Sequence, residues 1–166
     1  SQIHKLIRSI PRKMEISSWK MEGPFDSSYS LSILNRNLAS SLNKYIDNFS
    51  IHITEGNGDY QPDLDYLSQF PLIFDIYKNS LKLTNSSQVV SRNLYPPRVS
   101  DLDANFNLLH SYGWEESTFP ADWVDNFNSY LDGITVMSNQ VKKILIDNGV
   151  NLPIAVSGLG LDHLNS

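Results

Sequence analysis

The spacing of apolar residues in the first third of the chain predicts a helix followed by a strand. Leucines recur every three or four positions, so they share one face of a helix. They are Leu31, Leu34, Leu38 and Leu42, with Tyr45 next in the series. Ser27 or Ser28 is expected to cap the first turn of this helix. Residues 49–53 then alternate apolar and polar side chains, which is the period-two pattern of a strand.

Later segments continue this alternation of strands and helices. Strands are predicted at residues 14–19, 88–94, 106–110, 133–137 and 154–156. Helices are predicted within residues 62–80, with a break near Pro71, then after Pro120 and after Ser138, whose hydroxyl is expected to cap the last of them. The alternation predicts an α/β fold over residues 1–166, namely a Rossmann-like parallel sheet with helices on both faces.

Parallel sheets of this kind bind their ligands beyond the carboxyl ends of the strands. The loops at these ends are therefore expected to share one edge of the molecule. They are the loops at Gly23, Gly56, Tyr95, His110 and Ser138.

Composition narrows the classes of protein that remain. The 166 residues carry a net charge of −5, which argues against a nucleic-acid-binding domain. The chain has no cysteine, so it contains no disulfide and no thiolate nucleophile, which fits a cytoplasmic location. Four basic residues precede the first acidic residue of the chain. They could contact a membrane surface or a phosphate, or they could form a solvated arm. They are Lys5, Arg8, Arg12 and Lys13.

The loop at residues 22–28 is a candidate ligand loop. It follows the first predicted strand and precedes a helix, whose N-terminal amides suit a phosphate or a sugar hydroxyl. The candidate residues are Gly23, Pro24, Phe25, Asp26, Ser27 and Ser28. The alternative is an ordinary turn with serine caps. The glycine pattern of a dinucleotide-binding loop is absent here.

His110 stands at the end of a predicted apolar strand, where it could accept a proton, donate to a sugar hydroxyl or bond to the backbone. Glu115 and Glu116 follow closely. They either orient the histidine and bind hydroxyls or favour the N-terminus of the next helix. The other histidines have no ligand spacing among themselves, so no zinc site is expected.

Two Asp-Leu-Asp triplets occur, at residues 63–65 and 101–103. A pair of this type can hold a divalent cation that is bound to a diphosphate. Because each triplet lies near a proline and before a predicted helix, helix capping is the preferred interpretation. We therefore expect no metal ion and no cofactor.

Three segments together resemble the N-terminal domain of family 4 retaining glycosyltransferases, which have the two-domain GT-B fold. The first is EGPFDSSYSLSILNR at residues 22–36. The second is HSYGWEES at residues 110–117 with FPADW at 119–123, and the third is LDGITVMS at 131–138 with VKKIL at 141–145. The order of these segments carries the resemblance. The segment VSGLGLD at 156–162 is similar to a PNGVD turn of the family but departs from it, and it is given no role.

The resemblance implies that the chain is one half of a GT-B architecture. His110 would be the catalytic residue and contact the transferred sugar, and Gly23 would lie near the donor phosphates. Arg92, Glu115, Glu116 and Ser138 would bind acceptor hydroxyls or phosphates. The partners would be a nucleotide-sugar donor, a hydroxyl acceptor and a C-terminal domain that follows this one. The reaction would transfer a sugar with retained configuration.

Two other classes of function stay open at this point. A non-enzymatic α/β module of flavodoxin-like build would need no second domain. A nucleotide-dependent oxidoreductase is opposed by the missing glycine fingerprint.

Overall fold

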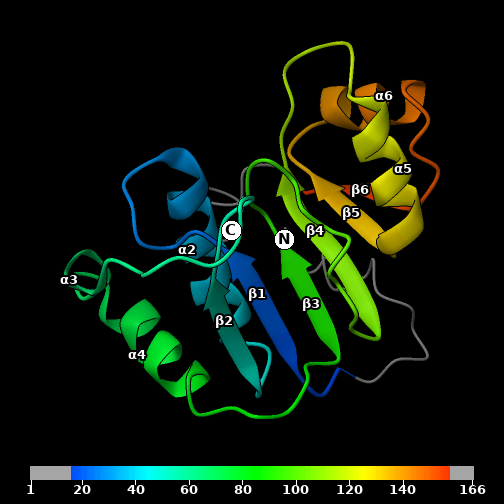
Figure 1. The fold of residues 1–166 in the computed structure, drawn as a ribbon. Coiled ribbons are helices and arrows are strands. Elements are labelled where there is room, and N and C mark those ends of the chain that lie inside the picture. Colours follow the sequence, from blue (N-terminus) through cyan, green and yellow to red (C-terminus); the bar gives the residue numbers. More distant parts are fainter. Residues whose placement is uncertain (1–15, 158–166) are drawn as a thin grey trace.

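The protein is described by a computed structural model at residues 16–157, and within this range the chain forms one parallel sheet flanked by helices (Figure 1). The strands are β1 (Trp19–Gly23), β2 (Phe49–Ile53), β3 (Val89–Arg92), β4 (Phe106–Tyr112), β5 (Gly133–Val136) and β6 (Ile154–Val156). The helices are α2 (Ser30–Leu42), α3 (Leu64–Leu67), α4 (Pro71–Ser80), α5 (Ala121–Tyr130) and α6 (Asn139–Asp147). Every strand pair is parallel, so the predicted α/β, Rossmann-like fold class is confirmed.

The strands lie in the order β2-β1-β3-β4-β5-β6. The chain first moves outward from β1 to β2, and then returns past β1 to β3. The direction of winding therefore reverses between β1 and β3, and ligands of open α/β sheets bind at the carboxyl ends of the strands beside such a reversal. The order of the first five strands is the flavodoxin-like order.

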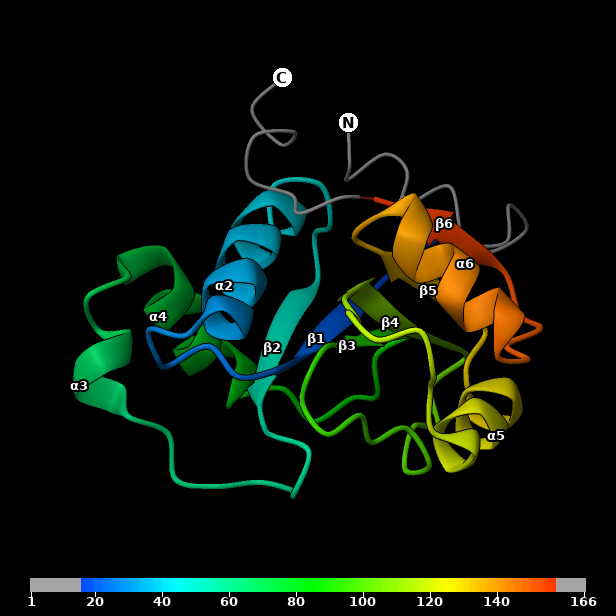
Figure 2. The same ribbon diagram turned by 90° about the horizontal axis from the view of Figure 1, so that it is seen from above.

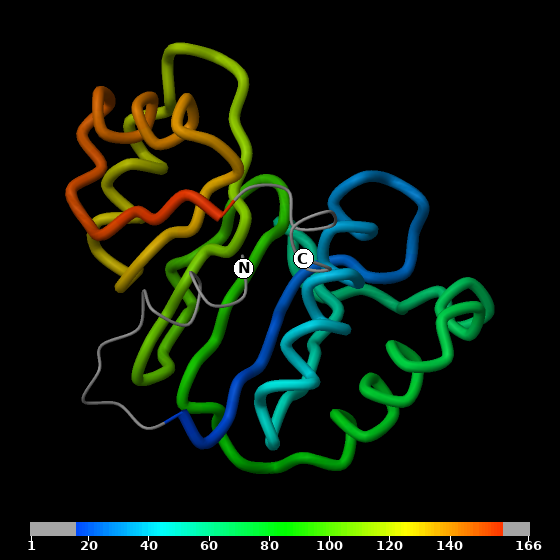
Figure 3. The backbone as a smooth tube through the Cα atoms, turned by 180° about the vertical axis from the view of Figure 1, so that it is seen from behind, coloured from blue at the N-terminus to red at the C-terminus, as the bar shows by residue number. Residues whose placement is uncertain are grey.

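Helices cover both faces of the sheet, and each face has its own apolar core. The neighbouring residues Leu108 and Leu109 of β4 belong to different cores, because successive side chains of a strand point to opposite faces. The core at Leu108 includes side chains of α2 and α4, and the core at Leu109 includes side chains of α5 and α6. The view from above separates these two groups of helices (Figure 2). From behind, α2 lies over the β1–β2 side of the sheet (Figure 3).

The prediction for the first strand was wrong in its position. β1 begins at Trp19 and continues to Gly23, whereas residues 16–18 are not in a strand and residues 14 and 15 lie outside the described range. Because Lys20 and Glu22 are charged, this segment was interpreted as a loop. Glu22 is nevertheless buried, since its carboxylate is paired with Arg92 of β3 and with Lys20.

The helix caps agree with the prediction at two helices and differ at a third. The Ser138 hydroxyl accepts a hydrogen bond from the Val141 amide (3.2 Å), which confirms the cap of α6. Asp63 caps α3 in the same way, and Pro71 begins α4, as expected of a helix-breaking residue. The cap expected from Ser27 or Ser28 is absent: the residue before α2 is Tyr29, which makes no side-chain capping bond.

Candidate functional site

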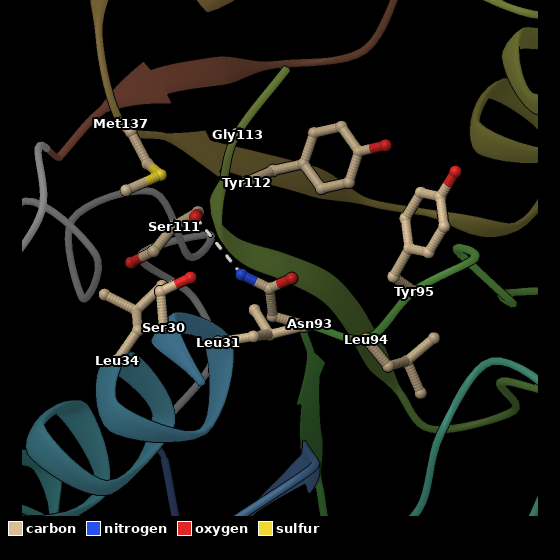
Figure 4. A pocket seen from close by; sticks show the side chains of 10 residues that line it. All are labelled: Ser30, Leu31, Leu34, Asn93, Leu94, Tyr95, Ser111, Tyr112, Gly113 and Met137. Carbon is tan, nitrogen blue, oxygen red and sulfur yellow. Dashed lines mark hydrogen bonds between the residues drawn. The ribbon is translucent and has the colours of Figure 1, made fainter. Parts of the chain in front are cut away.

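Two adjoining pockets lie at the carboxyl edge of the sheet. We call the first the switch-point pocket. It measures about 210 Å³ and is lined by Ser30, Leu31, Leu34, Asn93, Leu94, Tyr95, Ser111, Tyr112, Gly113 and Met137 (Figure 4). We call the second the β4–α6 pocket. It measures about 640 Å³ and is lined by Tyr95, Gly113, Trp114, Glu115, Glu116, Met137, Ser138, Gln140 and Val141. Both are lined by Tyr95, Gly113 and Met137, so together they form one cleft.

The first turn of α2 forms one side of the switch-point pocket. Ser30 and Leu34 face toward Ser111 in Figure 4, and the Tyr112 ring points away from them. The first amides of a helix have no partner inside the helix, and Tyr29 supplies no side-chain acceptor for them. The hydroxyl of Ser27 lies instead 2.6 Å from the hydroxyl of Ser32. The pocket is therefore bordered by a helix N-terminus without a side-chain cap.

Two buried asparagines hold the floor of this pocket together. The Asn35 side-chain amide donates to the carbonyl of Pro24 (3.0 Å) and to that of Asn93 (3.1 Å). The Asn93 side chain donates in turn to the carbonyls of His110 (3.0 Å) and Ser111 (3.2 Å). These bonds join the loop after β1 to the carboxyl ends of β3 and β4. The predicted convergence of the Gly23 loop and His110 at one edge of the sheet is thus confirmed.

His110 lies below the cleft, on the α2 side of β4, and lines neither pocket. Its side chain is fully buried, and Nε2 is 2.8 Å from Oδ1 of Asn35. Because the Asn35 amide nitrogen already donates to two carbonyls, its oxygen faces the ring and accepts a hydrogen bond from the Nε2–H group. Its Nδ1 is buried without a hydrogen-bond partner in the described chain, and burial lowers the pKa of the ring to about 3, so the imidazole is neutral at pH 7. Without exposed surface, it does not meet the predicted role of contacting a sugar. We assign it a positioning role.

The pKa of His110 predicts a pH dependence of stability. Burial lowers this pKa from 6.5 to about 3, so between these two pH values His110 is protonated in the unfolded chain and neutral in the folded chain. The contribution of His110 to the stability of the folded chain is therefore complete above pH 6.5 and is lost as the pH falls toward 3. We expect the free energy of unfolding to fall by about 2 kcal/mol between pH 7 and pH 5 on account of His110.

Urea unfolding of the wild type and of His110→Gln at both pH values measures this effect. The variant should lose that part of the pH dependence even if its absolute stability is lower. His52→Gln is the matched control, since His52 is exposed beside Asp59. An equal pH dependence in the wild type and His110→Gln would show that His110 is not buried in the neutral form.

Arg92, a predicted substrate-binding residue, is fully engaged inside the protein. It donates to Glu22 through Nε (2.8 Å) and Nη2 (2.6 Å), and to Asp101 through Nη1 (2.7 Å) and Nη2 (3.2 Å). Its remaining N–H group donates to the carbonyl of Arg98 (2.6 Å). All five N–H groups of a guanidinium are thus occupied, and the side chain is 5% exposed. The substrate-binding role predicted for Arg92 is corrected to a structural one.

Asp101 also departs from its prediction, because no helix follows it for the triplet at 101–103 to cap. It pairs with Arg92 and with Arg98 instead. Burial alone would raise the pKa of Asp101, but the hydrogen bonds and charges of Arg92 and Arg98 outweigh it, and the net shift is downward. The carboxylate therefore stays ionised as part of an ion-pair network.

The residues of the loop after β1 support the cleft and do not line its two pockets. Pro24 and Phe25 are buried, and Asp26 accepts hydrogen bonds from the Tyr60 hydroxyl and the Asp63 amide. The Arg36 guanidinium donates to the carbonyls of Phe25 and Ser27, and Ser28 is exposed.

Gly23 has a positive φ of 152°, and a Cβ built there would lie 2.3 Å from the Asn93 carbonyl oxygen. Gly23 therefore lies close to the backbone of Asn93, whereas a close approach to donor phosphates was predicted. The absence of a side chain at this position allows the loop to dock on the end of β3.

Three predicted residues do line the β4–α6 pocket: Glu115, Glu116 and Ser138. No site role was predicted for Tyr95, Trp114 or Gln140, which line the same pocket. Asn35 was also overlooked. It lies one position after Leu34 and three before Leu38, so a buried polar residue on the apolar face of α2 was visible in the periodicity.

Comparison with models of protein families, with curated proteins and with solved structures gave no match. Among residues 16–157, no three or more His, Cys, Asp or Glu side chains are grouped so that they could hold a metal ion. In the same range, no helix has both the length and the apolar character needed to cross a membrane. The basic residues before Glu15 and the segment 158–162 lie outside the described part of the chain.

Proposed function

We propose that this chain is the acceptor-side half of a retaining glycosyltransferase, which transfers a sugar from a nucleotide-sugar to a hydroxyl acceptor. The observation that carries the proposal is the two-pocket cleft at the carboxyl edge, beside the reversal of strand order. An uncapped helix N-terminus borders one end of this cleft, and hydroxyl-binding side chains line the other. Such a cleft suits a ligand with a phosphate part and a polyhydroxylated part.

The donor phosphates are assigned to the switch-point pocket. The amides at the start of α2 carry a partial positive charge and lack a side-chain acceptor. Ser30, Asn93 and Ser111 add uncharged polar groups, and no residue that lines this pocket in the described chain is acidic. A phosphate in this pocket therefore meets donors without like-charge repulsion.

A second domain is the proposed partner of this cleft. The resemblance to GT-B enzymes assigns most nucleotide-sugar contacts to that domain, and the cleft on this chain would be its facing wall. One wall alone should bind ligands weakly, because most of a ligand's surface is buried in a complete site. The proposed reaction uses no metal ion and no redox cofactor, and its proposed location is the cytoplasm, with the membrane surface as a peripheral contact.

A flavodoxin-like binding module is the second candidate function. One observation favours it: the order of the first five strands, β2-β1-β3-β4-β5, is the flavodoxin-like order. Such a module would bind a phosphate-bearing ligand at the same edge without transferring a group. The two candidates therefore share the phosphate end of the cleft and differ at the other end.

Phosphate binding at α2 is tested by titrating the ¹⁵N-labelled chain with uridine and guanosine diphosphates. We expect amide shifts at residues 30–32 and near Asn93 and Ser111. Ser30→Pro removes one amide donor at the first helical position, where proline is tolerated, and should weaken binding by about tenfold. Ser30→Ala keeps the amide and is the control. Equal binding by both variants, or shifts far from this edge, would refute the assignment.

Transfer itself is tested in a protein that joins this chain to a second α/β domain, by following nucleoside diphosphate release with ³¹P NMR. We expect release to depend on a hydroxyl acceptor. Diphosphate binding without any acceptor-dependent release would favour the binding module.

A further inference from the structure

We propose that the β4–α6 pocket binds a neutral saccharide, so that the acceptor hydroxyl belongs to an uncharged sugar and not to an anionic one. This inference rests on the proposed function and specifies the acceptor of the same cleft. It is carried by three features of the pocket: a fixed aromatic wall, polar side chains without internal partners, and the sign of the lining charge.

Tyr95 and Trp114 form the aromatic wall. The Tyr95 ring is 63% exposed, and its edge packs on Trp123 with ring centroids 6.2 Å apart. Trp114 is half-buried, packs on Phe119 (4.9 Å) and on Trp123 (5.5 Å), and donates from Nε1 to the carbonyl of Thr118 (2.9 Å). These contacts hold the Trp114 ring before a ligand arrives, and the edge contact with Trp123 orients the exposed Tyr95 ring. A sugar ring presents C–H groups on its faces, and such a face gains contact area against a fixed aromatic ring.

Three polar side chains of the pocket are available for hydroxyl groups. Glu115, Glu116 and Gln140 are exposed, and within residues 16–157 none of them makes a hydrogen bond or an ion pair. Carboxylates accept two or more hydrogen bonds each, and an amide both donates and accepts. Adjacent hydroxyls of a sugar are donors and acceptors at once. The set therefore matches a polyol that lies with one face on the aromatic wall.

The charge of the pocket disfavours anionic ligands. No Lys or Arg is among the described residues that line it, whereas two carboxylates are. The N-terminus of α6 contributes only about half a positive unit charge, and the Ser138 hydroxyl already accepts from its Val141 amide. A phosphorylated or carboxylated acceptor would meet net repulsion here. The switch-point pocket thus favours a phosphate, whereas the β4–α6 pocket favours an uncharged ligand.

Saturation-transfer NMR on the full chain tests the inference with glycosides at tens of millimolar. The probes are methyl α-D-glucopyranoside, methyl α-D-mannopyranoside and methyl β-D-galactopyranoside, each compared with methyl α-D-glucuronide as the anionic counterpart. At least one neutral glycoside should bind and shift amides between residues 113 and 116 and near Gln140. The glucuronide should bind roughly tenfold more weakly than methyl glucoside.

Two pairs of variants locate the effect. Tyr95→Ala should weaken the binding of the neutral glycoside by about three- to tenfold, whereas Tyr130→Ala, another exposed tyrosine that lines neither pocket, should leave it unchanged. Glu115→Gln with Glu116→Gln should narrow the difference between glucoside and glucuronide. Asp125→Asn on α5 is the matched charge control and should not narrow it.

Three results overturn the inference: no neutral glycoside binds, the glucuronide binds as well as the glucoside, or Tyr95→Ala has no effect. Its failure is distinguishable from failure of the proposed function. Diphosphate shifts at residues 30–32 without glycoside binding would remove only the saccharide assignment. Glycoside binding without diphosphate binding would remove the transferase proposal and leave a sugar-binding domain.

Discussion

Replacing Arg92 with methionine is expected to lower the free energy of unfolding by about 3 kcal/mol, because the change leaves a buried carboxylate without its cation. Glu22 is 5% exposed and receives two hydrogen bonds from Arg92. Lys20, whose Nζ lies 3.1 Å from the second oxygen of Glu22, keeps part of the charge compensated. Urea unfolding at neutral pH measures the loss.

Two further variants make this prediction specific. The double variant Glu22→Met with Arg92→Met should lose less stability than Arg92→Met alone, since no buried charge is then left unpaired: Lys20 is partly exposed and Asp101 keeps Arg98. Lys143→Met removes an exposed ion pair with Asp147 on α6 and should cost under about 1 kcal/mol. If Arg92→Met lowers the free energy of unfolding no more than Lys143→Met does, the Arg92 guanidinium does not hold β1 to β3. The structural role assigned to Arg92 would then be wrong.

Asn35→Leu is expected to destabilise the protein by about 3–5 kcal/mol, although leucine has the same number and branching of side-chain heavy atoms as asparagine. Asn35 is fully buried and hydrogen-bonds to the carbonyls of Pro24 and Asn93 and to the imidazole of His110. Leucine makes none of these hydrogen bonds, and each buried polar group left without a partner lowers the free energy of unfolding by about 1–3 kcal/mol. Chemical denaturation gives the size of the loss, and ring resonances of His110 report whether its partner has gone.

Asn37→Leu is the matched control, because Asn37 lies two positions further along the same helix and makes no hydrogen bond through its side chain in the described chain. Its substitution should change stability by less than about 1 kcal/mol. Equal effects of the two substitutions would mean that Asn35 does not organise the carboxyl edge of the sheet.

The local pattern of apolar and polar residues predicted those parts of the fold in which the apolar positions are also the buried ones. The period-two segment at residues 49–53 and the capped helix after Ser138 were placed correctly, because one face of each is apolar and the ends carry turn or cap residues. β1 was misplaced because the charge of Glu22 is neutralised by Arg92, which lies 70 residues away along the chain. No local window contains that information.

The site was predictable in outline and not in detail. Alternating elements implied a common carboxyl edge, and Glu115 and Glu116 line a pocket at this edge, while their binding role stays a prediction. His110 was expected in the cleft itself, but β4 continues through His110 to Tyr112. The register shifts between Leu109 and Tyr112, where Ser111 has a positive φ of 52°. A bulge of this kind sets which face a side chain takes, and periodicity does not reveal it.

The proposed cleft holds a phosphate-bearing donor and a neutral saccharide side by side in its two pockets. Interligand NOEs, measured with uridine diphosphate glucose and the best-binding methyl glycoside both present, test it most directly. We expect NOEs between the two ligands in the wild type and in Tyr130→Ala, and clearly weaker NOEs in Tyr95→Ala. Simultaneous binding of both ligands without any interligand NOE in the wild type would contradict it.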